Sequence, residues 1–161
     1  MSGMSVREGM LLIACIILPL VIGFIGSFFT FENIPNWYAT LNKPWFTPPS
    51  WVFGPAWTIL YILMGTSLFL VIRDGFTDRK VTQAAGIYGA QLVVNLSWSL
   101  VFFGMQSPVG GLVTILILLA LIIATIRSFY PISKTAAYLL IPYLCWTSFA
   151  TLLNTAIVLL N

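Results

Sequence analysis

The sequence predicts an all-α integral membrane protein: a single domain over residues 1–161 that forms a bundle of five transmembrane helices, with a tryptophan- and proline-rich lid between the first two. Two observations support this fold class. The chain is 60% hydrophobic and only 7% charged, whereas a soluble domain carries about 25% charged residues. It also contains five apolar stretches that are each long enough to cross a bilayer.

The first predicted span covers residues 10–29, MLLIACIILPLVIGFIGSFF. About 20 apolar residues are long for the hydrophobic region of a signal peptide, so we expect a retained helix rather than a cleaved leader. Pro19, Gly23 and Ser27 recur every four residues and form a stripe of small residues on one face. Such a stripe lets another helix approach closely, either within one subunit or between two.

The predicted lid covers residues 30–51. The stretch from Trp37 to Tyr61, which runs from the lid into the second span, holds four of the six tryptophans. A helix could not contain Pro44, Pro48 and Pro49 together, because each proline lacks an N–H donor and clashes with the preceding turn. We therefore expect an irregular aromatic cap that lies over the bundle.

The remaining spans are predicted at residues 50–72, 82–105, 109–129 and 136–160. The link from Gln106 to Pro108 is so short that the third and fourth helices are expected to be antiparallel neighbours. RDGFTDRK, residues 73–80, is the only charged run in the chain and separates the second span from the third, and residues 127–134 link the fourth span to the fifth.

Basic residues gather on one side of the predicted bundle. Lys43 is the only one in the lid, and the other six fall on the opposite side: Arg7, Arg73, Arg79, Lys80, Arg127 and Lys134. Loops rich in lysine and arginine stay in the cytoplasm. The sequence therefore predicts a multi-pass protein of the cell membrane with a cytoplasmic N-terminus, and with its lid and C-terminus outside.

The composition argues against several classes of function. The sequence has no histidine, which is the usual general base and a common metal and haem ligand. No predicted span contains the carboxylate of a proton relay, no ligand spacing predicts a metal site, and no basic run indicates a nucleic-acid partner. Cys15 and Cys145 lie in apolar runs and are expected to be small buried hydrophobes. Indole side chains are then the only unusual reactive groups.

One face of the third span carries polar and aromatic side chains. Gln91, Asn95, Trp98 and Phe102 are spaced by four, three and four residues, so they share one helical face. Polar side chains at membrane depth tend to face the bundle interior or a cavity. The alternative for Asn95 is an ordinary hydrogen bond between helices, which is common in membranes.

The fifth span carries a similar face. Tyr143, Thr147, Ala150 and Asn154 lie on it, and Trp146 borders it. As for Asn95, the alternative to a cavity-lining role for Asn154 is an ordinary hydrogen bond between helices. A tryptophan in the middle of a span is not explained by the aromatic belt at the membrane interface.

The second span contributes Trp57 and Tyr61 to a third such face. Three helices thus turn aromatic and amide side chains inward beneath an aromatic lid. This pattern predicts a pocket for a flat, largely apolar ligand with a few polar edges. Trp45 and Trp51 of the lid are better explained as anchors at the membrane interface.

Three separated motifs carry a family resemblance that covers essentially the whole chain. They are Trp37-Tyr38, Lys43-Pro44, Pro48-Pro49 and Gly54-Pro55-Ala56-Trp57 around the lid, Asn95-Leu96-Ser97-Trp98-Ser99 in the third span, and Pro142-Tyr143, Trp146, Phe149-Ala150 and Leu153-Asn154 in the fifth. In this order they resemble the tryptophan-rich sensory protein and translocator protein family, also called peripheral benzodiazepine receptors.

The resemblance implies both a fold and a ligand. It implies a five-helix membrane protein, usually a homodimer, whose pocket under the lid binds porphyrins such as protoporphyrin IX. Some bacterial members of that family degrade protoporphyrin in light with two tryptophans, whose positions correspond to Trp37 and Trp146. No cofactor is obligatory, and a metal-free porphyrin is favoured over haem because the chain has no histidine.

The candidate ligand-binding residues have two sources. The resemblance implies pocket-lining roles for Tyr38, Trp57, Asn95, Trp98 and Ala150. The polar faces and the lid add Lys43, Pro48, Tyr61, Gln91, Phe102, Tyr143 and Asn154. Because Lys43 is the only cation on the lid side, it is the candidate partner of a porphyrin propionate, and the alternative is that it snorkels to the membrane interface.

The leading hypothesis is a membrane receptor or sensor that binds porphyrin, extended by slow light-dependent porphyrin breakdown. The alternative is a transporter of lipid, sterol or other small apolar molecules, and a third hypothesis is a scaffold whose lid binds another protein. Sterol binding has little support: no lysine or arginine follows Lys134, so the cholesterol motif of animal members, an aliphatic–Tyr–basic pattern, is absent.

Overall fold

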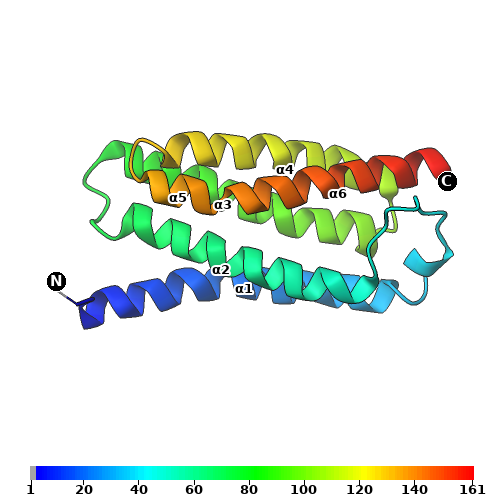
Figure 1. Ribbon diagram of the computed structural model, residues 1–161, viewed down its shortest axis with the longest axis horizontal. Helices are drawn as coiled ribbons and strands as arrows, with labels where there is room; N and C mark the ends of the chain where they lie inside the picture. Colours follow the sequence, from blue (N-terminus) through cyan, green and yellow to red (C-terminus); the bar gives the residue numbers. More distant parts are fainter. Residues whose placement is uncertain (1–2) are drawn as a thin grey trace.

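The structure is a computed structural model that describes residues 3–161 as a bundle of helices (Figure 1). Its α-helices are α1 Val6–Asn33, α2 Phe53–Ile72, α3 Arg79–Ser99, α4 Pro108–Phe129, α5 Lys134–Leu139 and α6 Ile141–Leu160. Shorter helical turns are η1 Tyr38–Thr40, η2 Ser50–Val52 and the π-helical η3 Leu100–Gly104. Five segments of the described chain are long and apolar enough to cross a membrane, which confirms the predicted five-helix class.

The first helix, α1, is longer than the span expected over residues 10–29. It begins at Val6 because Ser5 and Glu8 form a capping box. The Glu8 N–H donates to Ser5 Oγ (3.1 Å), and the Ser5 N–H donates to the Glu8 carboxylate (3.2 Å). The helix also continues to Asn33, so the lid begins inside the expected range of 30–51 rather than at its start.

The fifth span was expected to be one helix and consists of two, α5 and α6, which meet at Leu140. Pro142 lies in the first turn of α6, where a residue without an N–H starts a new helix. At the break the Leu140 N–H donates to the Ala137 carbonyl. The Ala136 carbonyl instead accepts the Ser67 hydroxyl of α2 (2.7 Å), so a neighbouring helix satisfies the interrupted backbone.

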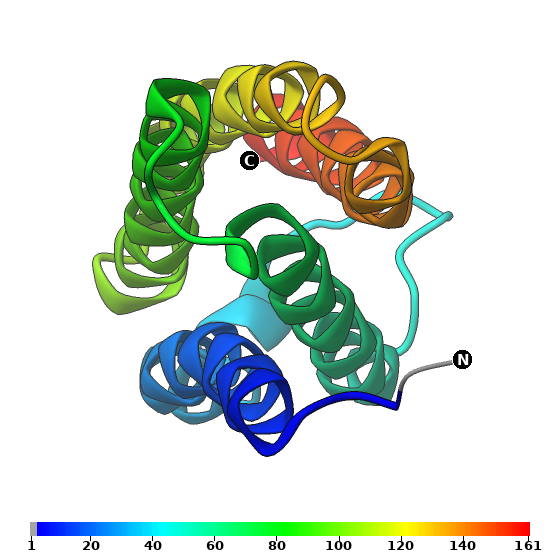
Figure 2. The ribbon, with the colours of Figure 1, turned by 90° about the vertical axis from the view of Figure 1, so that its left-hand side faces the viewer.

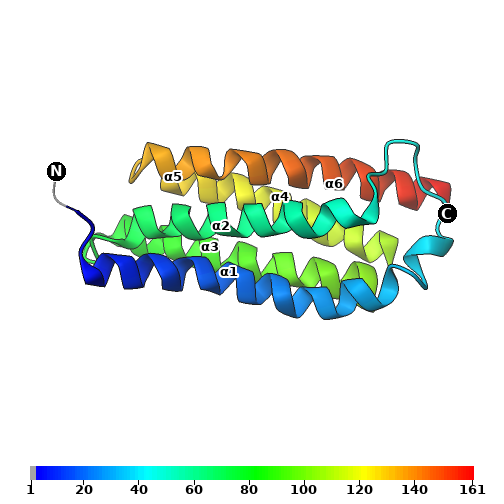
Figure 3. The same ribbon diagram turned by 60° about the horizontal axis from the view of Figure 1, so that its bottom comes forward.

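The helices form a closed ring around the bundle axis. Their order is α1, α2, α5 with α6, α4 and α3, and α3 packs back against α1 (Figure 2). The N-terminal residues and the α2–α3 and α4–α5 links lie at one end, and the lid and the end of α6 lie at the other (Figures 1 and 3). We call these the basic end and the lid end, because six of the seven lysines and arginines lie toward the first.

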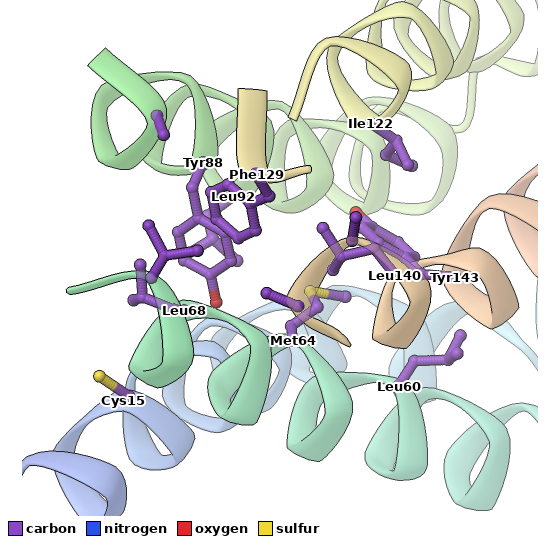
Figure 4. Close-up of a cluster of buried hydrophobic side chains, with 14 of the residues drawn as sticks. Cys15, Leu60, Met64, Leu68, Tyr88, Leu92, Ile122, Phe129, Leu140 and Tyr143 are labelled. Atoms are coloured by element: carbon purple, nitrogen blue, oxygen red, sulfur yellow. The ribbon is translucent and has the colours of Figure 1, made fainter. Parts of the chain in front are cut away.

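The half of the bundle toward the basic end is filled by a packed core (Figure 4). Met64 and Phe129 are fully buried there, and Tyr88 stacks on Phe129 with ring centres 5.9 Å apart. Cys15 joins this core, as expected, whereas Cys145 is exposed on the bundle surface. The expectation of burial is therefore wrong for Cys145, because an apolar run in a membrane helix also contains the residues that face lipid.

Two glycines bring α1 and α2 into close contact. A Cβ atom on Gly65 would meet backbone atoms of Cys15 and Ile16, and a Cβ atom on Gly23 would meet the ring of Tyr61. The predicted small-residue stripe of α1 therefore serves packing within the subunit, at least at Gly23.

Candidate ligand-binding site

The half of the bundle toward the lid end encloses a cavity of about 340 Å³, a usual size for a small-molecule site. Its walls come from α1, α2 with η2, α3 with η3, α6 and the lid. None of its lining residues carries a charge. The site is therefore an apolar hollow inside a membrane-spanning bundle, with a few polar groups on its walls.

Most of the predicted site residues meet at this cavity. It is lined by Tyr38, Trp57, Tyr61, Asn95, Trp98, Phe102, Trp146, Ala150 and Asn154. They come from the lid and from three helices, so the faces predicted for the second, third and fifth spans do converge in space.

Five predicted site residues lie elsewhere. Trp37 packs edge-on against Phe102, with ring centres 5.4 Å apart, and does not line the cavity. Pro48 lines a separate apolar groove between α2 and α6. The other three are Lys43, Gln91 and Tyr143, whose contacts are described below.

A chain of hydrogen bonds forms the floor of the cavity. The Tyr61 hydroxyl donates to Asn95 Oδ1 (3.0 Å), and Asn95 Nδ2 donates to the Tyr143 hydroxyl (2.8 Å). The Tyr143 hydroxyl donates in turn to Gln91 Oε1 (2.8 Å). These bonds link α2, α3 and α6. Asn95 therefore makes hydrogen bonds between helices, its alternative role, and it also lines the cavity. Gln91 and Tyr143 lie behind it and are about 1% exposed.

A second polar link supports the wall. The Trp98 N–H donates to Asn154 Oδ1 (3.1 Å), and Asn154 Nδ2 donates to the Pro108 carbonyl at the start of α4 (2.8 Å). Asn154 thus connects three helices. Because its amide accepts from Trp98 and donates to Pro108, Asn154 fixes the Trp98 indole against α6, and one donor and one acceptor position of the amide are left over.

Stacked aromatic rings make up much of the remaining wall. Trp57 stacks on Tyr61 with ring centres 5.7 Å apart, and Trp98 stacks on Phe102 with ring centres 5.2 Å apart. Trp146 meets the edge of Phe53 at 6.1 Å. Rings held in this way by their neighbours offer fixed flat surfaces to a flat ligand.

Two buried donors of the cavity have no hydrogen-bond partner within residues 3–161. They are the Tyr38 hydroxyl and the Trp146 indole N–H. Burial raises the pKa of Tyr38 to about 12, so its hydroxyl keeps its proton at any physiological pH. A buried donor without a partner is costly, and both donors belong to side chains that line the cavity, so a ligand acceptor that reached them would relieve this cost.

Lys43 organises the lid instead of lining the cavity. Its ammonium group donates to the Tyr38 carbonyl (2.9 Å) and to the Leu41 carbonyl (3.2 Å). The same group lies 4.7 Å from the centre of the Tyr38 ring, a cation–π distance. Trp45 and Trp51 are 95% and 74% exposed at the lid end, as interfacial anchors require.

The sequence reasoning missed the contribution of α1. Phe24, Ser27, Thr30 and Phe31 all line the cavity. The stripe that includes Ser27 was a signal, but it was interpreted only as a packing surface. Nothing in the sequence distinguishes Phe24 and Phe31 from phenylalanines that face lipid.

Comparison with known proteins agrees with this architecture. A model of the TspO/MBR family matches residues 15–160. The "Tryptophan-rich protein TspO" of Chlorobaculum tepidum is 47% identical over 155 residues, which cover 96% of this chain and 98% of that protein. The protein of the same name from Archaeoglobus fulgidus is 49% identical, over 93% and 96% of the two chains. The human "Translocator protein" is 41% identical, over 81% and 78%. The chain therefore belongs to the TspO/MBR family.

Proposed function

We propose that this chain is a membrane receptor or sensor that binds protoporphyrin IX, or a related flat and largely apolar molecule, in the lid-end cavity. The observation that carries the proposal is the chemistry of the cavity: it is uncharged, has stacked aromatic walls and contains two buried donors without a partner within residues 3–161. Membership of the TspO/MBR family supports a sensing or transport role at a membrane in general.

The aromatic walls suit a flat macrocycle. Aromatic contacts contribute about 0.5–1.5 kcal/mol each beyond the burial of area, and the indoles of Trp57, Trp98 and Trp146 all line the cavity. Because hydrogen bonds and packing hold these rings in place, little side-chain entropy is lost when a ligand stacks on them.

The unpaired donors and the lid suit the polar edges of a porphyrin. The Tyr38 hydroxyl and the Trp146 N–H require acceptors, which ring nitrogens and carboxylate oxygens provide. The cavity lining has no cation for the propionates. Lys43 donates two of its three N–H bonds to lid carbonyls, which leaves one for a propionate at the edge of the lid. The absence of histidine from the sequence favours a metal-free porphyrin over haem.

We further propose that the protein slowly breaks down bound porphyrin in light and oxygen. The two candidate tryptophans for this reaction, Trp37 and Trp146, lie in different positions. Trp146 lines the cavity and can touch a bound ring directly. Trp37 lies behind Phe102 and is not part of the lining. Any reaction at a bound porphyrin would thus depend more on Trp146 than on Trp37. Illumination of the two single Trp→Phe variants, with product formation followed by absorbance, tests this ranking.

Titration of the purified protein with protoporphyrin IX tests binding. Tryptophan fluorescence should be quenched with saturation, and the affinity should fall in Trp146→Phe, which keeps a ring and removes the N–H donor. Trp45→Phe is the matched control, because Trp45 is exposed at the lid end. Quenching that never saturates, or that weakens equally in both variants, would reject the site.

Transport of small apolar molecules is the second candidate function. The observation that favours it is a second apolar hollow, the groove between α2 and α6, which shares Trp146 with the cavity. Two apolar hollows that share one lining tryptophan are what a path for apolar molecules requires. Flux of an apolar dye in proteoliposomes should then exceed that of Trp98→Ala, and equal flux would reject transport.

We also propose that the basic end faces the cytoplasm of a cell-membrane protein. Six of the seven basic residues lie toward that end, and Lys43 lies in the lid. A reporter fused after Asn161 should be active outside and inactive in the cytoplasm. Activity of the reporter in the cytoplasm would reverse the orientation.

We also propose that the chain forms a homodimer, and that the outward face of α3 is the interface. A Cβ atom on Gly86 or on Gly89 would meet nothing within 4 Å, and Ala90 is exposed beside them. Small residues of this kind let two membrane helices pack closely. Gly86→Phe should therefore reduce crosslinked dimer in membranes, whereas an unchanged dimer would move the interface elsewhere.

A further inference from the structure

The cavity is exposed on one side only. All of its lining residues that are exposed on the bundle surface belong to α1 or to the start of the second span: Phe24, Phe31, Ser50, Gly54 and Thr58. Phe24 and Phe31 are 65% and 66% exposed. The lining residues of the lid, α3, η3 and α6 are buried or half-buried. The opening therefore lies between α1 and α2.

The two helices change from close contact to separation along their length. Toward the basic end, Gly65 packs against the α1 backbone, and at the cavity itself Gly23 still packs against the Tyr61 ring. Closer to the lid, a Cβ atom on Gly26 would meet Ser99 of α3 instead, and one on Gly54 would meet nothing within 4 Å. In this region α1 leans on α3, which leaves the gap beside Gly54 on α2.

The lid, in contrast, is fastened at its far side. The Asn42 N–H donates to Asn161 Oδ1 (3.0 Å), and Asn161 Nδ2 donates back to the Asn42 carbonyl (2.8 Å). Asn42 Nδ2 also donates to the Leu160 carbonyl (3.3 Å). Tyr38 packs on Phe103 with ring centres 5.7 Å apart, and it is only 5% exposed. Several contacts would have to break before a ligand could pass beneath the lid.

The rim of the opening is chemically suited to lipid. Its aromatic residues are phenylalanines, and the hydroxyls of Ser27 and Thr58 are satisfied within their own helices. The Ser27 hydroxyl donates to the Phe24 carbonyl (2.6 Å), and the Thr58 hydroxyl donates to the Gly54 carbonyl (2.8 Å). The rim therefore offers no charge to an ionic solute, and these two hydroxyls do not require water.

We infer that the cavity exchanges its ligand directly with the bilayer, through a lateral portal between the lid-end halves of α1 and α2, while the lid stays closed. This inference rests on the proposed function and narrows its ligands to flat molecules that partition into membranes. A ligand then reaches the site from the lipid phase at its membrane concentration. The lid acts as a fixed roof that keeps the aqueous phase out.

Gly54→Phe tests the portal, because position 54 borders the opening and has room for a side chain. The matched control is Gly9→Phe, an equally open glycine of α1 near the basic end. Protoporphyrin IX is transferred from phosphatidylcholine vesicles to proteoliposomes, and tryptophan quenching is followed in time. Association and dissociation should both slow about tenfold or more in Gly54→Phe, a rise of about 1.4 kcal/mol in each barrier. The two rates should slow together, because a blocked path affects both directions, whereas a change in only one of them would show that the new ring had altered the binding site instead.

Asn161→Ala provides the opposite perturbation, since it removes the side chain that fastens the lid. The portal predicts unchanged exchange rates in this variant. Faster exchange in Asn161→Ala, or wild-type rates in Gly54→Phe, would overturn the portal while leaving the binding site intact. Thr58→Phe repeats the block if Gly54→Phe does not fold. If the wild-type chain shows no saturable quenching, the proposed function fails, and the portal fails with it.

Discussion

The two halves of the bundle are built from the same helices and are packed differently. Toward the basic end, Met64 and Phe129 fill the interior, and Gly65 lets α1 touch α2. Toward the lid end, rings and amides of the same helices stand around a cavity. A packed half stabilises the bundle and holds the helices at fixed distances, so the other half can remain hollow without collapse.

The largest effect is expected from Gly65→Val in the packed half. Its side chain would meet the backbone of Cys15 and Ile16, which cannot move aside without separating two helices. We expect a loss of about 3 kcal/mol of stability or more, measured by thermal unfolding in detergent. Gly54→Ala is the control, because a Cβ atom there meets nothing within 4 Å. Equal loss in both variants would mean that the two halves do not differ in packing.

A smaller effect is expected at the boundary between the halves. Tyr143→Phe keeps the ring and removes two hydrogen bonds of the cavity floor, those with Asn95 and Gln91. Such bonds contribute about 0.6 kcal/mol each on average in membrane proteins, so the stability should fall by about 1–2 kcal/mol. Ligand affinity should change less, because Tyr143 does not line the cavity. If affinity fell more than stability, Tyr143 would be part of the binding surface.

Tyr38→Phe should weaken binding, and it should raise stability or leave it unchanged, because the lost hydroxyl is buried without a partner in the described part of the chain. It removes a buried hydroxyl that has no partner within residues 3–161, so the folded protein loses no bond while the ligand loses a donor. We expect the affinity to fall several-fold, by about 1 kcal/mol, in the fluorescence titration. A variant with unchanged affinity and raised stability would show that the hydroxyl serves no ligand.

The pH dependence follows from the same hydroxyl. Because burial raises the pKa of Tyr38 from 10 to about 12, its neutral form is favoured in the folded protein. Its contribution to stability is complete below pH 10 and is lost as the pH rises through 12. Binding by the folded protein should thus be constant from neutral pH to above pH 10 and weaken only as the pH approaches 12, since tyrosinate cannot donate. An affinity change between pH 7 and 9 would point to a different group.

The smallest effect on the protein is expected from chemical labelling of its two cysteines. Cys15 is buried in the packed half, and Cys145 is exposed on the surface of α6. In detergent, a maleimide should modify one thiol per folded chain, and Cys145→Ser should abolish the reaction, as mass spectrometry would show. Equal labelling of Cys15 would mean that the packed half opens readily.

Much of the architecture could be predicted from the sequence. The five spans follow from hydrophobicity, which is a local property, and the inward faces of three helices follow from residue spacing. Asn95, Trp98 and Asn154 do meet at one cavity. The helix ends were less predictable: α1 extends to Val6 because of the Ser5–Glu8 capping box rather than its apolar run.

Only the tertiary structure decided which neighbour each face meets. Gly23 and Gly86 look alike in the sequence, yet Gly23 packs against Tyr61 and Gly86 faces open space. Lys43 turns to the carbonyls of its own lid, and Trp37 lies behind Phe102. Helical periodicity fixes the direction of a side chain relative to its own axis. What that side chain touches depends on how the other helices are arranged around it, which spacing along one helix does not encode.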